Sequence, residues 1–239
     1  MPHSSPKTAL ITGAAHRVGR AIAIGLAQAG WNAAITYNVS RDEAEETVAS
    51  IEKLGRKAIA IKADFTRPQK SAPAVKEAVH KRLGKIHLLV NNASIYLPGD
   101  DPDDARRMWA VHVETPLLLA RAFAADLRSG GRIVNMLDAM VQTPRPEYAA
   151  YCASKAGLWN LTLSLARQFA PHATVNGIAP GVVLWPKGYP KNLQQKYLRR
   201  VPLRQAGNPR QVVQCVLFFC QQDYVTGQVV VLDGGRSLV

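Results

Sequence analysis

Residues 7–30 read KTALITGAAHRVGRAIAIGLAQAG, and this stretch decides the fold. An apolar run comes first, a glycine turn follows, and apolar side chains then recur at helical spacing, at Ile22, Leu26 and Ala29, up to Gly30. A strand, a glycine turn and a helix in this order are typical of the first unit of a dinucleotide-binding domain. In such units the first turn of the helix receives a phosphate group.

The rest of the chain repeats this alternation of strand and helix. Several of the short apolar runs are apolar throughout, as strands covered on both faces are. The pattern predicts one α/β domain over residues 1–239, with a doubly wound (Rossmann-type) seven-stranded parallel sheet and helices on both faces. The predicted strands are Lys7–Thr12, Asn32–Tyr37, Lys57–Lys62, Ile86–Asn91, Arg132–Leu137, Ala173–Ile178 and Gln228–Leu232. The later predicted helices are Asp42–Leu54, Ala74–Leu83, Leu117–Leu127, Ala149–Phe169 and Val212–Phe219.

The composition restricts the class of protein. With 239 residues, 47% of them hydrophobic, the chain can bury one large core. The net charge is +13, but Lys and Arg are scattered in small groups without an aromatic platform, which argues against nucleic-acid binding. No apolar run approaches the ~18 residues of a membrane span, and MPHSSPK at the start lacks the apolar segment of a secretion signal. The three cysteines fit neither a disulfide framework nor a tetrahedral metal site, so we expect a cytoplasmic protein without membrane partner or metal.

The glycine turn carries an unusual concentration of charge. His16, Arg17 and Arg20 stand at the start of a helix, where the helix dipole disfavours cations. A bound anion removes that conflict, so we expect the backbone N–H groups of this turn, together with Arg17, to hold the pyrophosphate of a dinucleotide. Cations that simply face solvent are the alternative interpretation.

The end of the second predicted strand indicates which dinucleotide is bound. Folds that bind NAD place an acidic residue ~20 positions after the glycine turn, where it holds the ribose hydroxyl. Residues 36–41 read TYNVSR and contain no carboxylate, whereas Tyr37, Asn38, Ser40 and Arg41 offer partners for a phosphate. NADPH is therefore favoured over NADH. Alternatively, Ser40 only caps the next helix and Arg41 lies on the surface.

A second group of residues indicates proton transfer. Tyr151 and Lys155 are four apart in a predicted helix and share a face, so the ammonium can stabilise the ionised phenol. Asp138 ends an apolar strand thirteen positions before Tyr151. An ionised carboxylate repels a carbonyl oxygen that gains negative charge, so Asp138 suits protonation of a ring nitrogen better than reduction of a ketone. The alternative is that Asp138 caps a neighbouring backbone amide.

These motifs resemble the short-chain dehydrogenase/reductase family over nearly the whole chain. The matching segments are TGAAHRVG at 12–19, Asn91-Asn92-Ala93, Tyr151-x-x-x-Lys155 and Pro180-Gly181. Most members carry serine where Asp138 stands and glycine where Arg17 stands, and this pair of residues is similar to the pteridine reductase branch, close to the dihydromonapterin reductases. Further matches are Ser94, Tyr96, Tyr148 and the ending DGGRSL at 233–238.

The resemblance implies NADPH-dependent reduction of a pterin or folate, with Asp138, Tyr151 and Lys155 as catalytic residues. Together with the motifs, it implies cofactor contacts from Gly13, His16, Arg17, Val18, Gly19, Tyr37, Asn38, Ser40, Arg41, Asp64, Phe65, Asn92, Ala93, Ser94, Tyr151, Lys155, Pro180 and Gly181. The implied substrate contacts are Arg17, Ser94, Tyr96, Asp138, Tyr148, Tyr151 and Trp185, the last within a substrate lid around residues 182–208. Tyr96 is expected to stack the substrate, and Ser94 to bond either the cofactor phosphate or the pterin amino group.

One position departs from the family pattern. His112 aligns with an asparagine that the wider family uses in a lysine–water–asparagine proton relay, and a histidine there either joins a relay or is simply a satisfied buried side chain. Family analogy also implies a homotetramer built on Val212–Phe219 and Val229–Leu232. Three other functions stay open: a dihydromonapterin or dihydrofolate reductase, a carbonyl or 3-ketoacyl reductase, and a protein that binds NADPH without turnover.

Overall fold

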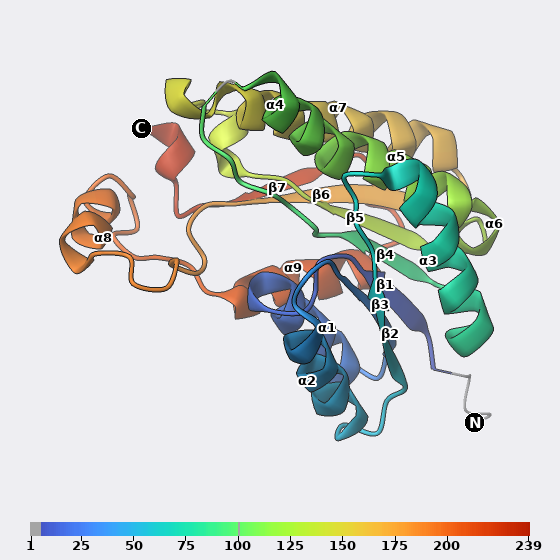
Figure 1. Ribbon diagram of the computed structural model, residues 1–239. Coiled ribbons are helices and arrows are strands. Elements are labelled where there is room, and N and C mark those ends of the chain that lie inside the picture. The colour runs from blue at the N-terminus through green and yellow to red at the C-terminus, as the bar shows by residue number, and fades with distance from the viewer. Residues whose placement is uncertain (1–5, 100) are drawn as a thin grey trace.

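Seven parallel strands form one sheet in the order β3-β2-β1-β4-β5-β6-β7 (Figure 1). The computed structural model describes residues 6–99 and 101–239, so most of the segment MPHSSPK, examined above for a secretion signal, lies outside the described residues. The strands are β1 Thr8–Ile11, β2 Asn32–Tyr37, β3 Ala58–Lys62, β4 Leu88–Asn91, β5 Arg132–Met136, β6 Thr174–Pro180 and β7 Val229–Leu232. The predicted Rossmann-type fold is confirmed, because the strands are apolar on both sides and helices cover both faces.

Helices pack against the sheet in two layers, each with its own apolar core (Figure 1). One layer contains α1, α2 and α9, which bury residues such as Leu26, Ile51 and Phe219 against the sheet. The other contains α3, α5 and α7, which bury residues such as Val79 and Phe169. The helices are α1 Arg17–Gln28, α2 Arg41–Glu52, α3 Pro68–Leu83, α4 Pro102–Trp109, α5 Thr115–Ala122, α6 Ala124–Leu127, α7 Ala149–Phe169, α8 Lys191–Leu198 and α9 Pro209–Gln221.

The helix boundaries correct three sequence predictions. Helix α3 begins six residues before the predicted Ala74, because Pro68 suits a first turn, and it continues through Pro73. The predicted helix Leu117–Leu127 is two helices, α5 and α6, separated at Phe123. Helix α4 was not predicted, although its start carries a clear signal: the Asp101 side chain accepts hydrogen bonds from the backbone N–H groups of Asp103 and Asp104.

The strand order places the functional residues at one edge of the sheet. After β3, at one edge of the sheet, the chain returns to the middle and forms β4 beside β1. The connections that leave β1 and β4 therefore run in opposite directions, which opens a crevice between these two strands. Ligands of doubly wound sheets bind in this position, beyond the carboxyl ends of the strands. The segment 182–208, which contains α8, projects past the same edge (Figure 1). Within the described residues, no helix is long and apolar enough to cross a membrane.

Candidate active site

Two adjoining cavities lie at the carboxyl edge of the sheet. The first, about 320 Å³, is bordered by the glycine turn and by the residues that follow β2 and β3. The second, about 540 Å³, lies between the ends of β5 and β6 and the segment 182–208. Arg17, Val18, Asn92 and Ser94 line both cavities, so the two form one continuous cleft.

The glycine turn is held tightly against the end of β4. Gly13 has a φ of +63°, and a Cβ atom on it would lie 2.8 Å from the Cα of Ala93. A Cβ on Gly19 would lie 2.4 Å from the carbonyl oxygen of Gly13. The Asn92 Nδ2 group donates to the carbonyls of Thr12 and Gly13 at 2.9 and 3.0 Å, so this predicted cofactor residue also holds the turn in shape.

The three cations at this turn have different surroundings. Arg20 donates to Glu46 of α2 at 3.4 Å, so its charge is paired within the protein. The sequence had suggested instead that Arg20 helps to attract a bound anion. Arg17, at a φ of +54°, donates through Nη2 to the carbonyl of Leu184 at 3.1 Å and through Nη1 to that of Trp185 at 3.5 Å. His16 is exposed and lines the first cavity, and its side chain makes no hydrogen bond to the first turn of α1. The backbone N–H groups of that turn are thus left for a ligand.

Three of the four residues that the sequence assigns to a phosphate at the end of β2 border the first cavity. Tyr37, Asn38 and Ser40 border it, and the Ser40 hydroxyl makes no capping bond to α2. Arg41 does not border it, because its guanidinium donates to Glu45 at 2.7 Å on the exposed side of α2.

Asp64 and Phe65 lie in the same cavity, after β3. The Asp64 carboxylate accepts from the backbone N–H and the hydroxyl of Thr66 at 3.0 and 2.7 Å, and these bonds lower the pKa of Asp64. Phe65 is 6% exposed and packs into the core, so it forms a fixed apolar wall for the cavity. Ala93 borders the cavity too, and Pro180 and Gly181 border the second one.

Asp138, Tyr151 and Lys155 meet in the second cavity. The Tyr151 hydroxyl donates to Asp138 Oδ2 at 2.8 Å, and Asp138 Oδ1 accepts from the backbone N–H of Met140 at 2.8 Å. Asp138 therefore caps a backbone amide, which is the alternative interpretation of this residue, and it also binds the tyrosine. Lys155 is 2% exposed and donates to the carbonyl of Met136 at 2.8 Å.

The ionisation of these groups differs from the sequence expectation. We expected Lys155 to lower the pKa of Tyr151, but this pKa is raised well above its usual value, first by burial and then by the charge of Asp138 and the hydrogen bond to it. The reason is geometric: the ammonium points at the Met136 carbonyl and lies 5.9 Å from the centre of the tyrosine ring. Burial lowers the pKa of Lys155 to about 8, against an opposing effect of Asp138. Lys155 is thus largely protonated near neutral pH, and Tyr151 keeps its proton.

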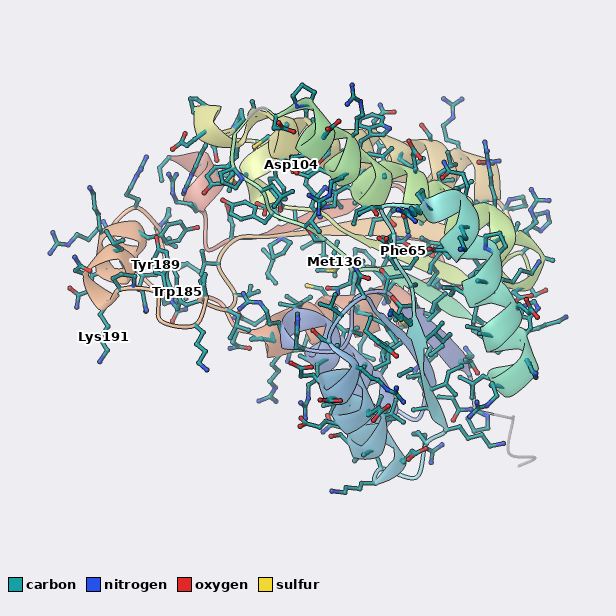
Figure 2. The ribbon with its side chains drawn as sticks, viewed as in Figure 1. Phe65, Asp104, Met136, Trp185, Tyr189 and Lys191 are labelled. Carbon is teal, nitrogen blue, oxygen red and sulfur yellow. The ribbon has the colours of Figure 1, made fainter. Side chains whose placement is uncertain are left out.

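Aromatic side chains line the second cavity at both ends. Tyr96 stacks on Tyr148 with ring centres 4.5 Å apart, and it meets the Tyr151 ring edge-on at 4.8 Å. In the projecting segment, Trp185 stacks on Tyr189 with ring centres 5.2 Å apart. Figure 2 shows these two residues near each other in that segment. The predicted substrate residues are therefore brought together around one cavity, which Tyr96, Tyr148 and Trp185 all line.

His112 lies beside this group, in a π-helical turn at Ala110–Glu114 that joins α4 to α5. It is 1% exposed, and its two ring nitrogens contact the hydroxyls of Ser94 and Ser154 at 2.9 and 2.8 Å. Burial and the charge of Lys155 keep the pKa of His112 well below its usual value. The histidine is therefore neutral and fully bonded.

Several residues that border the second cavity were not predicted from the sequence. They are Thr143, Arg145, Tyr197, Asp233 and Arg236. Thr143, Arg145 and Tyr197 belong to no motif, because they come from loops and from a helix of the projecting segment, whereas Asp233 and Arg236 belong to the ending DGGRSL, to which the family resemblance gave no role. Ser154 was also missed, although it stands next to Lys155 in the helix. Among the described residues, no group of three or more His, Cys, Asp or Glu side chains could hold a metal ion.

Comparisons with known proteins place this site among reductases. The family model described as enoyl-(acyl carrier protein) reductase matches residues 13–237. A 3-oxoacyl-[acyl-carrier-protein] reductase of Staphylococcus epidermidis is 31% identical over 97% of this chain and 99% of its own length. Pteridine reductase 1 of Leishmania tarentolae is 32% identical over 96% of each protein. The crystal structure of FolM alternative dihydrofolate reductase 1 from Brucella suis in complex with NADP has a TM-score of 0.91 and 33% identity, covering 98% of this chain and 96% of that one.

Proposed function

Because this chain belongs to the short-chain dehydrogenase/reductase family, and is thus an oxidoreductase, we propose that it uses NADPH to reduce a dihydropterin to a tetrahydropterin. Fully oxidised pterins and folates are further substrates under this proposal. The observation that carries it is the hydrogen bond from the Tyr151 hydroxyl to Asp138, inside a cavity with tyrosine walls.

The first cavity suits NADP(H). Gly13, Gly19 and the first turn of α1 leave backbone donors for a pyrophosphate, and Tyr37, Asn38 and Ser40 offer polar groups at the end of β2 without a carboxylate among them. The similar FolM structure from Brucella suis was determined with NADP. Lys155 and Tyr151, which line the second cavity, are the residues proposed to meet the nicotinamide ribose. When bound, the cofactor supplies the hydride.

The chain's own residues must then deliver a proton. Reduction of a C=N bond forms a C–H bond at carbon and requires one proton at nitrogen. The Tyr151 hydroxyl and Asp138 share a proton across 2.8 Å, and we assign its delivery to this pair. The loss of that proton leaves an additional negative charge, which is partly offset by the buried ammonium of Lys155, 5.9 Å from the centre of the Tyr151 ring. Tyr96 and Tyr148 offer a flat apolar surface for a bicyclic ring.

A 3-ketoacyl reductase is the competing function, since the Staphylococcus epidermidis relative carries that name and aligns over nearly its full length. In such a reaction a carbonyl oxygen gains negative charge beside the tyrosine. Asp138 would lie next to that oxygen and would repel it, whereas a nitrogen that gains a proton is attracted to a carboxylate. The carboxylate at position 138 therefore favours the pterin.

The test is to supply NADPH that carries deuterium at the transferable position, together with dihydrobiopterin, and to determine the mass of the product. The proposal predicts a tetrahydropterin with one deuterium on carbon. It is contradicted if dihydrobiopterin, dihydromonapterin and dihydrofolate all remain unchanged while a 3-ketoacyl thioester is reduced. Tight NADPH binding without turnover of either class would identify a binding protein instead.

The homotetramer is a separate proposal. Val212, Val216 and Phe219 of α9 are buried in this chain's own core, but Phe218 on the same helix is 45% exposed and β7 is an edge strand of the sheet. Phe218 and β7 are thus the parts of the predicted interface that are free to pack against another copy. Light scattering after size-exclusion chromatography tests this, and a monomer would contradict it.

A further inference from the structure

His112 is a buried titratable group that the proposed chemistry does not use. It stands between the loop after β4 and the N-terminal part of α7, two segments that both border the cleft. Its contacts fix the positions of its own protons, and through them the direction of the hydrogen bond made by Ser94.

The first constraint comes from α7. His112 Nδ1 lies 2.8 Å from the Ser154 hydroxyl oxygen. That hydroxyl donates its single proton to the backbone carbonyl of Tyr151 at 2.7 Å, because a carbonyl only accepts. Ser154 is therefore the acceptor toward the ring, and Nδ1 carries the proton.

The second constraint comes from the other side of the ring. His112 Nε2 lies 3.3 Å from the backbone N–H of Ile95, which is always a donor. Nε2 therefore presents its lone pair. Both sides of the ring require the same neutral tautomer, and the buried environment that lowers the pKa of His112 favours this neutral form.

This tautomer determines the direction of the hydrogen bond between Ser94 and His112. Its hydroxyl oxygen lies 2.9 Å from Nε2, so Ser94 must donate its proton to the histidine. Tyr151 gives its own proton to Asp138. Ser94 is an exposed residue that borders both cavities, and its hydroxyl also acts on Tyr151, whose pKa it tends to lower. Toward a ligand, Ser94 is thus an acceptor.

We propose that His112 is a positioning residue that makes Ser94 a hydrogen-bond acceptor, so that Ser94 recognises an N–H group of the substrate rather than a phosphate of the cofactor. A phosphate needs a donor from the protein, whereas an amino group needs an acceptor. The identification of that N–H group as the exocyclic amino group of a pterin rests on the proposed function. The carboxylate of Asp138 is a second acceptor in the same cavity, so the cleft suits a heteroaromatic ring with two donor positions.

The tautomer is tested directly in the ligand-free protein. Histidines labelled with ¹⁵N report by NMR which ring nitrogen carries the proton, and His112→Gln identifies the signal of His112 among the six histidines. We expect a neutral ring protonated at Nδ1 at neutral pH. A ring protonated at Nε2, or at both nitrogens, would overturn the inference whatever the enzyme reduces.

The role of Ser94 is tested with Ser94→Ala, His112→Phe and His112→Gln. We expect the first two to raise KM for a dihydropterin about tenfold, with a much smaller effect on an analogue that lacks the amino group, and to leave the Kd for NADPH within about twofold. His112→Gln should restore most of the preference for the amino group, because an amide can accept from Ser94 and donate to Ser154 at the same time.

The inference fails if Ser94→Ala weakens NADPH binding about tenfold and leaves the dihydropterin KM unchanged, since Ser94 would then hold the phosphate. It also fails if His112→Gln behaves like His112→Phe. If the unaltered enzyme turns over no dihydropterin, the proposed function is wrong, and the NMR result together with the NADPH affinities still decides whether His112 directs Ser94.

Discussion

Replacement of Asp138 by asparagine probes the chemistry most sharply, because it keeps the shape of the side chain and removes its charge. In the structure the Tyr151 hydroxyl donates to Asp138 Oδ2 at 2.8 Å. A hydrogen bond to a charged partner contributes ~1.5–3 kcal/mol, and one between neutral groups ~0.5–1.5 kcal/mol. The same difference applies to the attraction between the carboxylate and the nitrogen that gains a proton in the transition state, so a neutral amide loses about 1–2 kcal/mol there, which corresponds to a decrease of roughly 5- to 30-fold in kcat for a dihydropterin.

The same substitution should act differently on a 3-ketoacyl ester. Without the charge, an oxygen that gains negative charge is no longer repelled, so we expect this rate to stay constant or to rise. The pKa of Tyr151 should also fall, because Asp138 raises it through its charge and its hydrogen bond. The pH profile of kcat then shifts toward lower pH.

The assay is NADPH oxidation followed by absorbance, with both substrates offered to each variant. Glu147→Gln is the matched control, since it removes one carboxylate from an exposed position in the 3₁₀ turn Pro146–Tyr148 before α7. The reasoning is refuted if Asp138→Asn keeps dihydropterin kcat within about twofold of the unaltered enzyme, or if Glu147→Gln lowers it equally.

Three further predictions concern Lys155, Arg17 and Asn38. The pKa of Lys155, lowered from 10.5 to about 8, corresponds to a cost of about 3 kcal/mol near neutral pH. Lys155→Met should thus increase the free energy of unfolding in urea at about pH 7 while it abolishes turnover. Between pH 8 and 10.5 the unfolded chain binds more protons than the folded protein, so the free energy of unfolding of the unaltered protein rises over that range. The difference in free energy of unfolding between Lys155→Met and the unaltered protein should therefore narrow as the pH rises. A difference that stays constant would contradict the burial of a charged Lys155. Arg17→Ala should make the segment 182–208 more sensitive to limited proteolysis and raise the substrate KM, because the bonds to the carbonyls of Leu184 and Trp185 are lost. Arg17→Gly should have the same two effects. Its free energy of unfolding should be about 1 kcal/mol higher than that of Arg17→Ala, since the φ of +54° suits glycine. Asn38→Asp should weaken NADPH relative to NADH at least about tenfold in binding titrations, and equal affinities would contradict the assignment of the 2′-phosphate to the end of β2.

The parts of the molecule that sequence could predict are those set by local pattern. The strands followed from short apolar runs, and the meeting of Asp138 with Tyr151 followed from a strand end and a helix start that border the same edge of the sheet. The parallel order then brought the glycine turn to the same cleft.

The remainder depended on contacts between distant segments. Arg17 reaches carbonyls about 170 positions away only because the segment 182–208 returns over the glycine turn. Arg20 was expected to attract an anion, but the packing of α1 against α2 gives it Glu46 instead. The bonds of His112 to Ser94 and Ser154 likewise form where the loop after β4, the π-helical turn and α7 meet, and no spacing in the sequence predicts them.

Under the proposed function, the carboxylate at position 138 suits this enzyme to the reduction of a C=N bond. This is tested by the ratio of kcat/KM with NADPH for dihydrobiopterin, dihydromonapterin and dihydrofolate against a 3-ketoacyl ester, all determined with the unaltered enzyme. We predict that at least one dihydropterin or dihydrofolate exceeds the ketoacyl ester by a factor of about one hundred or more. A higher kcat/KM for the ketoacyl ester than for every dihydropterin and dihydrofolate would contradict the proposed function.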